Sequence, residues 1–179
     1  MKYIKYIPIF FSFILFSQND IEVQFIEKTK LQATNIVGFD NFKSLIYIEN
    51  NSLLANRPSG ALRYSNLQLG DITSANAFNP LKINVFYKDF STVMVLDNRL
   101  SEITKINFNT LEPFRNISHI STGNDNTIWI FNQDIQQLEL FDYRTNTTRA
   151  KTQPISENVI EITSNYNNCW LLTKKYLYI

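Results

Sequence analysis

Few side chains in this sequence could do acid–base or nucleophilic chemistry. His119 is the one histidine among 179 residues, and a histidine can act as a general base. No Ser or Cys nucleophile in a Gly-flanked turn lies near it, so we expect His119 to face solvent or to hydrogen-bond a turn. Cys169 lies within an apolar run, which predicts a buried and unreactive thiol. We predict no catalytic, cofactor-binding or metal-binding residue, and therefore no cofactor.

Carboxylates could support glycoside hydrolysis if two of them lay about 5–10 Å apart in a pocket. The candidates are Glu102, Glu112, Glu139, Glu157 and Glu161. Their spacing in the sequence gives no reason to place any two of them together. Paired carboxylates are therefore not predicted, although a cluster of them at a channel mouth would favour an enzyme.

Aspartates flanked by asparagines could instead suggest a calcium site. The positions are Asp40, Asp89, Asp125 and Asp134. Calcium needs about six to eight oxygen ligands at regular spacing, and no Asp-x-Asp-x-Asp-Gly loop is present. Asp and Asn side chains also hydrogen-bond the backbone of tight turns, so we predict Asx turns at these positions.

The composition is that of a β protein, and it lacks the excess positive charge that is typical of nucleic-acid-binding proteins. The chain is 44% hydrophobic and contains 14 Phe and nine Tyr, which favour strands over helices. The formal net charge is +1, so no basic patch for nucleic acid is indicated. A single cysteine excludes an intrachain disulfide, and a single histidine excludes a His-rich metal site within one chain.

The N-terminus has the pattern of an export signal. Lys2 and Lys5 precede the apolar run from Ile7 to Phe16, and Ser17 begins a polar stretch. The run is shorter than the roughly 20 residues that a membrane span needs. We therefore expect residues 1–17 to be a signal peptide, the mature protein to have no membrane span, and its location to be the periplasm, cell surface or extracellular space.

The rest of the chain repeats a pattern of short strands and polar turns. Ser44, Lys82, Thr127 and Asn168 directly precede equivalent apolar strands, with spacings of 38, 45 and 41 residues. A period of about 40–45 residues with four strands per unit is typical of propeller blades. We predict a domain over residues 18–179. It has an N-terminal strand in 20–30, blades in 31–69, 70–116 and 117–157, and a partial blade in 158–179.

The expected strands are short apolar segments between turn residues, with period-2 alternation in residues 21–26 and an almost wholly apolar second strand in each repeat. They cover residues 21–26, 34–39, 45–48, 52–55, 62–67, 72–78, 83–87, 92–96, 102–108, 117–122, 128–131, 138–141, 147–151, 159–164, 169–172 and 176–179. Trp129 and Trp170 fall at equivalent places in two of these strands. Aromatic rings can stack on a sugar, but equivalent strand positions predict packing between blades.

Two segments of the third repeat resemble a known class of repeat. The residues are Asn124-Asp125-Asn126-Thr127-Ile128-Trp129-Ile130 and Leu140-Phe141-Asp142. They resemble motifs of secreted bacterial β-propellers, including a regulator-type repeat with a core of Asp, Gly, a polar residue, Leu and Trp. Asn126 stands where that repeat has Gly. Residues 20–179 are similar to uncharacterised secreted propellers of Bacteroidota, and this resemblance implies the fold but no defined activity.

The fourth repeat has three expected strands instead of four. Strand Ile21 to Ile26 could supply the missing one and close a four-bladed ring. Alternatively the chain is a truncated part of a larger propeller, which is the interpretation we favour. Truncation would leave an unpaired strand edge.

The sequence predicts architecture and location rather than a reaction. The function it indicates is a non-catalytic secreted or periplasmic propeller that binds a protein or a glycan through loops at one end. A polar hairpin around Asn146, with Tyr143, Arg144 and Arg149, could touch such a partner or be a solvated turn. The alternatives are a propeller enzyme, such as a glycosidase or a quinone-type dehydrogenase, and a non-functional truncated gene product.

Overall fold

The computed structural model describes residues 23–26, 28, 30–40, 43–57 and 60–179. The chain divides into two units, Met1–Leu31 and Gln32–Ile179. The expected signal peptide at residues 1–17 lies outside the described residues. The strand expected from residue 21 to 26 is not present over its described part, residues 23–26, which are exposed and carry no strand. Apolar alternation makes a strand only where a neighbouring strand pairs with it.

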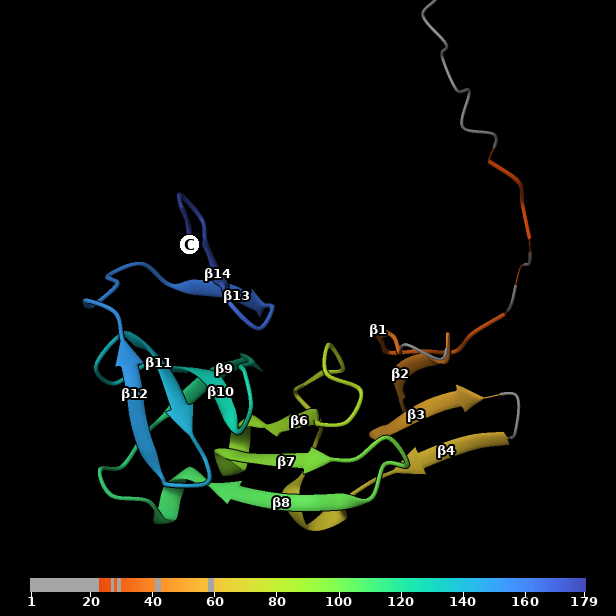
Figure 1. Cartoon of the computed structure of the whole chain (residues 1–179), viewed down its shortest axis with the longest axis horizontal. Helices are drawn as coiled ribbons and strands as arrows, with labels where there is room; N and C mark the ends of the chain where they lie inside the picture. Colours follow the sequence, from red (N-terminus) through yellow and green to blue (C-terminus); the bar gives the residue numbers. More distant parts are fainter. Residues whose placement is uncertain (1–22, 27, 29, 41–42, 58–59) are drawn as a thin grey trace, which may run out of the picture. The chain divides into compact units, whose positions relative to one another are not determined.

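Residues 32–179 fold into antiparallel sheets that follow one another along the chain (Figure 1). Each of the first three sheets has four strands and the fourth has three. The strands of the first two sheets are β1 (Asn35–Phe39), β2 (Leu45–Glu49), β3 (Ser52–Arg57), β4 (Gly60–Tyr64), β5 (Ser74–Asn76), β6 (Ile83–Tyr87), β7 (Thr92–Leu96) and β8 (Glu102–Asn107). Those of the last two are β9 (Ile117–Thr122), β10 (Thr127–Asn132), β11 (Gln137–Asp142), β12 (Thr147–Lys151), β13 (Val159–Ser164), β14 (Cys169–Thr173) and β15 (Leu177–Tyr178).

The second strand of each sheet shows why the sheets pack against one another. All five residues of β6 are buried. Ile83, Val85 and Tyr87 belong to the core shared with the first sheet, whereas Phe86 belongs to the core shared with the third. Side chains alternate between the two faces of a strand, so a strand covered on both faces is apolar at nearly every position.

Three apolar cores lie between successive sheets. Ile46 and Leu53 of the first sheet pack with residues of β6 and β7. Phe86 and other residues of the second sheet pack with β9, β10 and β11. Phe131 of the third sheet packs with Ile162 and Leu171 of the fourth. The second and third sheets therefore each bury one face against the sheet before and the other against the sheet after.

The first strands of the four sheets are the innermost. Contacts join β1 to β5, β5 to β9 and β9 to β13, and residues of all four strands line one hollow of about 440 Å³. Four-stranded antiparallel sheets arranged radially around a common axis are the blades of a β-propeller. The chain is therefore an all-β protein with four blades, and the predicted fold class is confirmed.

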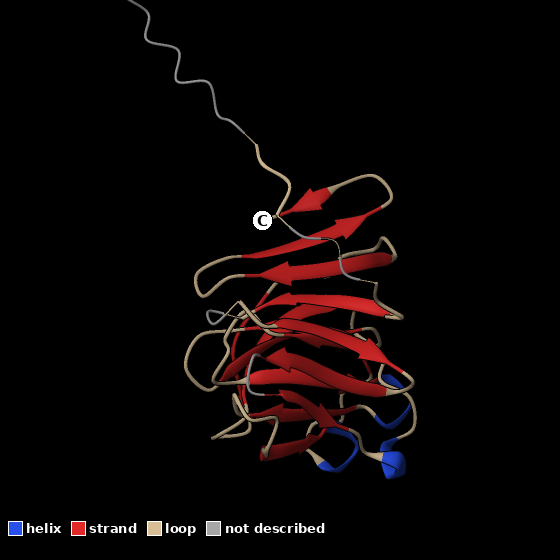
Figure 2. Ribbon diagram, turned by 90° about the vertical axis from the view of Figure 1, so that its right-hand side faces the viewer, coloured by secondary structure: helices blue, strands red, loops and turns tan. Residues whose placement is uncertain are grey.

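The two ends of the blades differ. At one end, which we call the hairpin end, the first and second strands of each blade are joined by residues 40–44, 77–82, 123–126 and 165–168. The other end carries three short 3₁₀ helices, Leu67–Leu69, Lys88–Phe90 and Phe108–Thr110, which lie on one side of the molecule in Figure 2. No helix in the described part of the chain is long and apolar enough to cross a membrane.

The turns at the hairpin end are built by Asx side chains. The Asp40 carboxylate accepts a hydrogen bond from the Ser44 N–H at 2.8 Å, and Asn79 Oδ1 accepts one from the Leu81 N–H at 3.0 Å. Asn165 Oδ1 accepts two, from the N–H groups of Asn167 and Asn168. The predicted Asx turn at Asp40 is thus confirmed, and it recurs at equivalent places in other blades.

Two strands end two or more residues before the predicted boundary. The fourth strand of the first blade ends at Tyr64 instead of residue 67, because Asn66 accepts the Gln68 N–H and starts a 3₁₀ helix. Strand β5 ends at Asn76 instead of residue 78, because the Asn76 side chain accepts the N–H of Phe78. In both places a local Asn–backbone hydrogen bond replaces the strand ladder.

The two tryptophans have different surroundings. Trp129 packs against the core between the third and fourth blades, as predicted. Trp170 is half-buried and pairs in register with Thr163, on the face of the fourth blade opposite to Cys169 and Leu171. Packing between blades is therefore confirmed for Trp129. Trp170 lies on a face that no described blade covers, so its packing stays a prediction.

Candidate functional site

The central hollow is polar at the end of the blades opposite the hairpins. Its lining includes Thr73, Lys88, Ser118, His119 and Glu161, contributed by three different blades. His119 lies in the innermost strand β9 and is half-buried. The expectation that it would face solvent or a turn is wrong, because it occupies a strand position that faces the common hollow.

Both sides of the His119 ring have a polar neighbour. Nδ1 lies 2.9 Å from the Ser118 hydroxyl, and the ring also hydrogen-bonds the backbone of Ile160 in the next blade. Burial lowers the pKa of His119, and the charge of Lys88 lowers it further, while the Ile160 bond and the charge of Glu161 oppose the shift. The imidazole is therefore neutral at pH 7 and helps to join β9 to β13.

The lowered pKa of His119 makes stability depend on pH. Below the ordinary pKa of about 6.5, the unfolded chain binds a proton that the folded chain resists, so the free energy of unfolding falls as the pH falls through that value. We expect the melting temperature of the wild type to drop between pH 7.5 and pH 5.5, and the drop to be smaller in His119→Gln. An equal drop in the two proteins would contradict this role.

A second hollow of about 510 Å³ adjoins the first. It shares Lys88 and His119 with the first hollow and adds Asp134 and Glu157. Asp134 accepts a hydrogen bond from the Asn116 amide at 2.8 Å, and Glu157 accepts one from the Tyr178 hydroxyl at 2.9 Å. Both carboxylates are thus held by local hydrogen bonds.

The five glutamates considered from the sequence are dispersed. Glu157 and Glu161 line different hollows, and Glu139 lines a third. Glu102 accepts a hydrogen bond from the Tyr64 hydroxyl at 2.9 Å, whereas Glu112 lines none of these hollows. Within the described residues, no group of three or more His, Cys, Asp or Glu side chains could hold a metal ion.

A buried ion pair underlies the third hollow, of about 490 Å³. Arg115 Nε donates to Glu139 Oε2 at 3.2 Å, and both side chains are nearly inaccessible. The Thr148 hydroxyl donates to the same carboxylate oxygen at 2.6 Å, and Asn132 Nδ2 donates to the other at 3.3 Å. The guanidinium lies 4.9 Å from the centre of the Phe141 ring. This network is fully paired, which points to a structural role.

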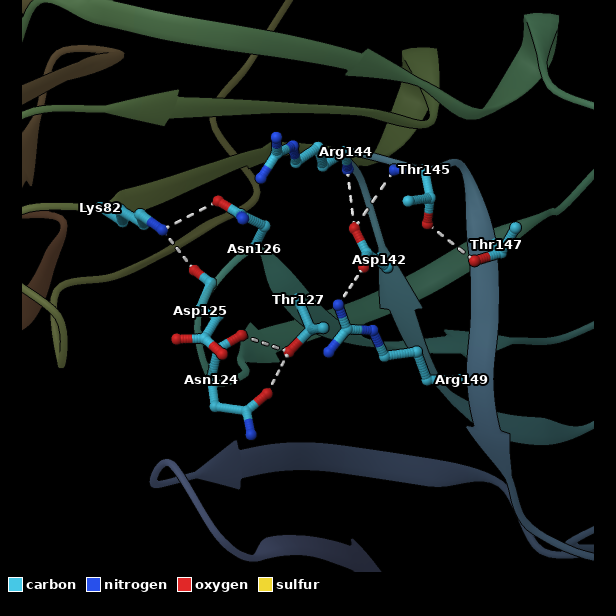
Figure 3. Close-up of polar contacts among 10 residues, drawn as sticks. All are labelled: Lys82, Asn124, Asp125, Asn126, Thr127, Asp142, Arg144, Thr145, Thr147 and Arg149. Carbon is cyan, nitrogen blue, oxygen red and sulfur yellow. Dashed lines mark hydrogen bonds and ion pairs between the residues drawn. The ribbon is translucent and has the colours of Figure 1, made fainter.

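At the hairpin end, polar contacts join neighbouring blades (Figure 3). Lys82 of the second blade donates to the Asp125 carbonyl and, at 3.0 Å, to Asn126 Oδ1 of the third. The Thr127 hydroxyl donates to the Asn124 carbonyl at 2.6 Å, which fixes the turn that Lys82 contacts. These bonds hold the inner turns of two blades together.

The hairpin around Asn146 is fixed by a buried carboxylate. Asp142 accepts hydrogen bonds from the N–H groups of Arg144 and Thr145 and from the Arg149 guanidinium (Figure 3). Burial alone would raise the pKa of Asp142, but these hydrogen bonds lower it below its usual value. Arg149 thus pairs with Asp142 within the hairpin, whereas the side chain of Arg144 is exposed to solvent.

An aromatic patch lies at the hairpin end beside these polar turns. We define it as Phe78, Leu81 and Tyr166, whose exposed fractions are 47%, 61% and 45%. The rings of Phe78 and Tyr166 meet edge to face with centroids 4.9 Å apart, although they belong to the second and fourth blades. Large apolar side chains in solvent-exposed turns are not needed for the blade cores, which are complete without them.

The predicted character of Cys169 is confirmed. Its side chain is buried in the core between the third and fourth blades. Burial raises the pKa of this thiol to about 12, so the reactive thiolate is scarce at neutral pH.

Solved structures with this arrangement are β-propellers. A chain of the mitotic checkpoint complex matches with a TM-score of 0.58 at 12% identity, over 97% of this chain and 61% of its own. The WD40 repeats of RRP9 match with a TM-score of 0.56 at 6% identity, over 80% of this chain and 46% of theirs. Virginiamycin B lyase from Staphylococcus aureus matches with a TM-score of 0.56 at 12% identity, over 77% of this chain and 47% of its own.

These matches define the class of the protein. The chain is a propeller repeat protein, and at such identities the likeness establishes the fold alone. It spans about half to three-fifths of the length of these structures. No protein-family model matches the chain, and no curated protein is similar to it in sequence.

Sequence reasoning missed the aromatic patch and the buried ion pair. Phe78 directly precedes the turn residue Asn79, and Tyr166 lies inside the turn from Asn165 to Asn168. Aromatic residues among turn residues could have indicated exposed aromatic side chains. The contact between Arg115 and Glu139 joins residues 24 apart in different elements. No periodic pattern marks such a pair before the fold is known.

Proposed function

We propose that this protein is a non-catalytic propeller that binds another protein at the hairpin end of its blades. The observation that carries the proposal is the aromatic patch, in which Phe78 and Tyr166 from different blades form one exposed apolar surface. Exposed aromatic side chains that are pre-positioned by rigid elements are the usual anchors of protein interfaces.

The surroundings of the patch support protein recognition. Asp125 and Arg144 are exposed in other turns of the same end, and Lys82, next to Leu81 in the chain, fixes the turn of the neighbouring blade. Interfaces commonly have an apolar centre with a polar and charged rim. The propeller chain of the mitotic checkpoint complex belongs, by its description, to an assembly of proteins, which makes this use of the fold reasonable.

The enzyme alternative has weaker support. His119 is the best candidate for acid–base chemistry, but its ring is engaged by Ser118 and by the Ile160 backbone. The carboxylates that a glycosidase would pair are spread over different hollows. We therefore favour binding over catalysis.

Site-specific photo-crosslinking tests this proposal. A benzophenone amino acid would replace Phe78 in the cells that make the protein, and in a matched control it would replace Phe90, which is 46% exposed at the opposite end. We expect a discrete protein adduct from position 78 and none from position 90. Equal adducts at both positions, no adduct at position 78, or an adduct with a polysaccharide would contradict protein binding at the hairpin end.

A further inference from the structure

The third hollow, which the buried ion pair underlies, has exposed apolar walls. Phe114, in the linker from the second to the third blade, is 54% exposed, and Ile135, in the turn between β10 and β11, is 48% exposed. Both residues line the hollow together with Pro113, and none of the three belongs to an apolar core between blades. The volume of about 490 Å³ lies within the range of about 300–1,000 Å³ that is usual for ligand sites.

The floor of this hollow is satisfied by its own hydrogen bonds. Arg115 donates to Glu139, to the Pro113 carbonyl at 2.8 Å and to the Thr148 hydroxyl at 3.2 Å. Glu139 is the only acidic residue among the described residues that line the hollow, and Arg115 neutralises it. The floor therefore needs no ligand to complete it, so the walls and the rim must define what the hollow can bind.

The rim of the hollow is basic. Arg149 and Lys151 of β12 line it. Arg149 pairs with Asp142, whereas Lys151 is exposed and makes no ion pair with any described residue. Lys151 is in register with Glu139, so its side chain leaves the sheet on the same face as the hollow. A ligand that carries a carboxylate beside an apolar group would complement this rim and these walls.

Strand β12 also offers an unpaired backbone edge. It is the outermost strand of the third blade, and among the described strands it pairs with β11 alone. Most of its residues line the hollow, namely Thr148, Arg149, Ala150 and Lys151. The edge of a sheet presents a row of free N–H and C=O groups, to which an extended peptide can add as a further strand.

We propose that this hollow binds an extended acidic segment of a partner protein. The segment pairs with the edge of β12, places an apolar side chain against Phe114 and Ile135, and places a carboxylate at Lys151. The backbone edge favours a peptide over a nucleic acid, which has the same negative charge but cannot continue a sheet. None of the residues involved belongs to the aromatic patch, so this site is independent of the proposed function.

Panning of phage-displayed random heptapeptides on the full chain tests the proposal. Phage that bind the double variant with Ile135→Asp and Lys151→Glu are removed first, so that only peptides that need the hollow remain. We expect the selected peptides to share an apolar and an acidic residue two positions apart, because alternate residues of a strand lie on one face. The most enriched peptide, labelled with fluorescein, then gives a Kd by fluorescence anisotropy.

Single variants and a modified peptide test each contact. We expect Lys151→Glu and Ile135→Asp each to raise the Kd about tenfold or more. Lys105→Glu is the matched control, because Lys105 is exposed in β8, the outermost strand of the second blade, and it should keep the Kd within about twofold. A version of the peptide with proline at its centre should bind far more weakly, since proline cannot donate to a strand ladder.

Four results would overturn the proposal. They are a failure to enrich any peptide, selected peptides without acidic residues, an equal loss of affinity in Lys105→Glu, and undiminished binding of the proline version. Displacement of the peptide by a single-stranded oligothymidine, with the same dependence on Lys151, would favour a nucleic acid instead and also overturn it. Near-UV circular dichroism verifies that the variants are folded, and Phe114→Ser replaces Ile135→Asp if the latter is not.

Discussion

Replacing Glu139 with alanine should lower the free energy of unfolding by about 3–5 kcal/mol, which is the usual cost of leaving one partner of a buried ion pair alone. Arg115 would lose the carboxylate that its Nε contacts at 3.2 Å, while its guanidinium stays buried beside Phe141. Thr148 and Asn132 would also lose their acceptor. Urea denaturation monitored by fluorescence would measure the change.

A double variant distinguishes the effect of losing the ion pair from the effect of losing side-chain packing. The double variant with Arg115→Met and Glu139→Leu carries neither charge. No uncompensated charge is then buried, so most of the stability lost in Glu139→Ala should return. Glu161→Ala is the control, because Glu161 is exposed in its strand and should change stability by less than about 0.5 kcal/mol. If Glu139→Ala were as stable as this control, the ion pair would make no contribution to the free energy of unfolding.

Replacing Phe86 with alanine should destabilise the fold by about 3–5 kcal/mol, as deletions of large buried aromatic side chains do. The ring is fully buried between the second and third blades, next to Val93, Ile106 and Phe108. Its removal leaves a cavity in an interface between two sheets, where the backbone ladders limit collapse. Loss of this contact should also lower the cooperativity between blades, which would appear as a shallower unfolding transition.

The matched control for Phe86 is Phe90→Ala, four residues later in the chain. Phe90 lies in a 3₁₀ helix and is half exposed, so its loss should cost far less. Similar destabilisation by the two substitutions would show that the blade interface is not the main source of stability. Thermal unfolding of both variants in one buffer gives the comparison.

Periodicity predicted the blades well because their cores depend on alternation. The bounds expected for β6, β7, β9, β12 and β13 are those observed, since turn residues flank each of these apolar segments. The expected strand at residues 21–26 was wrong over its described part, since a strand also needs a partner. Asn66 and Asn76 shortened the neighbouring segments through hydrogen bonds that periodicity does not register.

The candidate sites were less predictable than the fold. His119 was assigned to a turn or to solvent, whereas the ring lies in the innermost strand, because nothing in the sequence marks which strand lines the axis. The edge-to-face contact of Phe78 with Tyr166 joins residues of different repeats. Such contacts depend on how blades are arranged around the axis, and repeat spacing alone does not define that arrangement.

The affinity for the protein captured at position 78 tests the central claim most directly. Isothermal titration of that purified protein should give a Kd about tenfold weaker or more for Phe78→Ala and for Tyr166→Ala, since truncation of an interface anchor costs at least about 1.4 kcal/mol. Phe90→Ala, at the opposite end, should leave the Kd within about twofold of the wild type. A Kd unchanged in Phe78→Ala and Tyr166→Ala would contradict recognition through the aromatic patch.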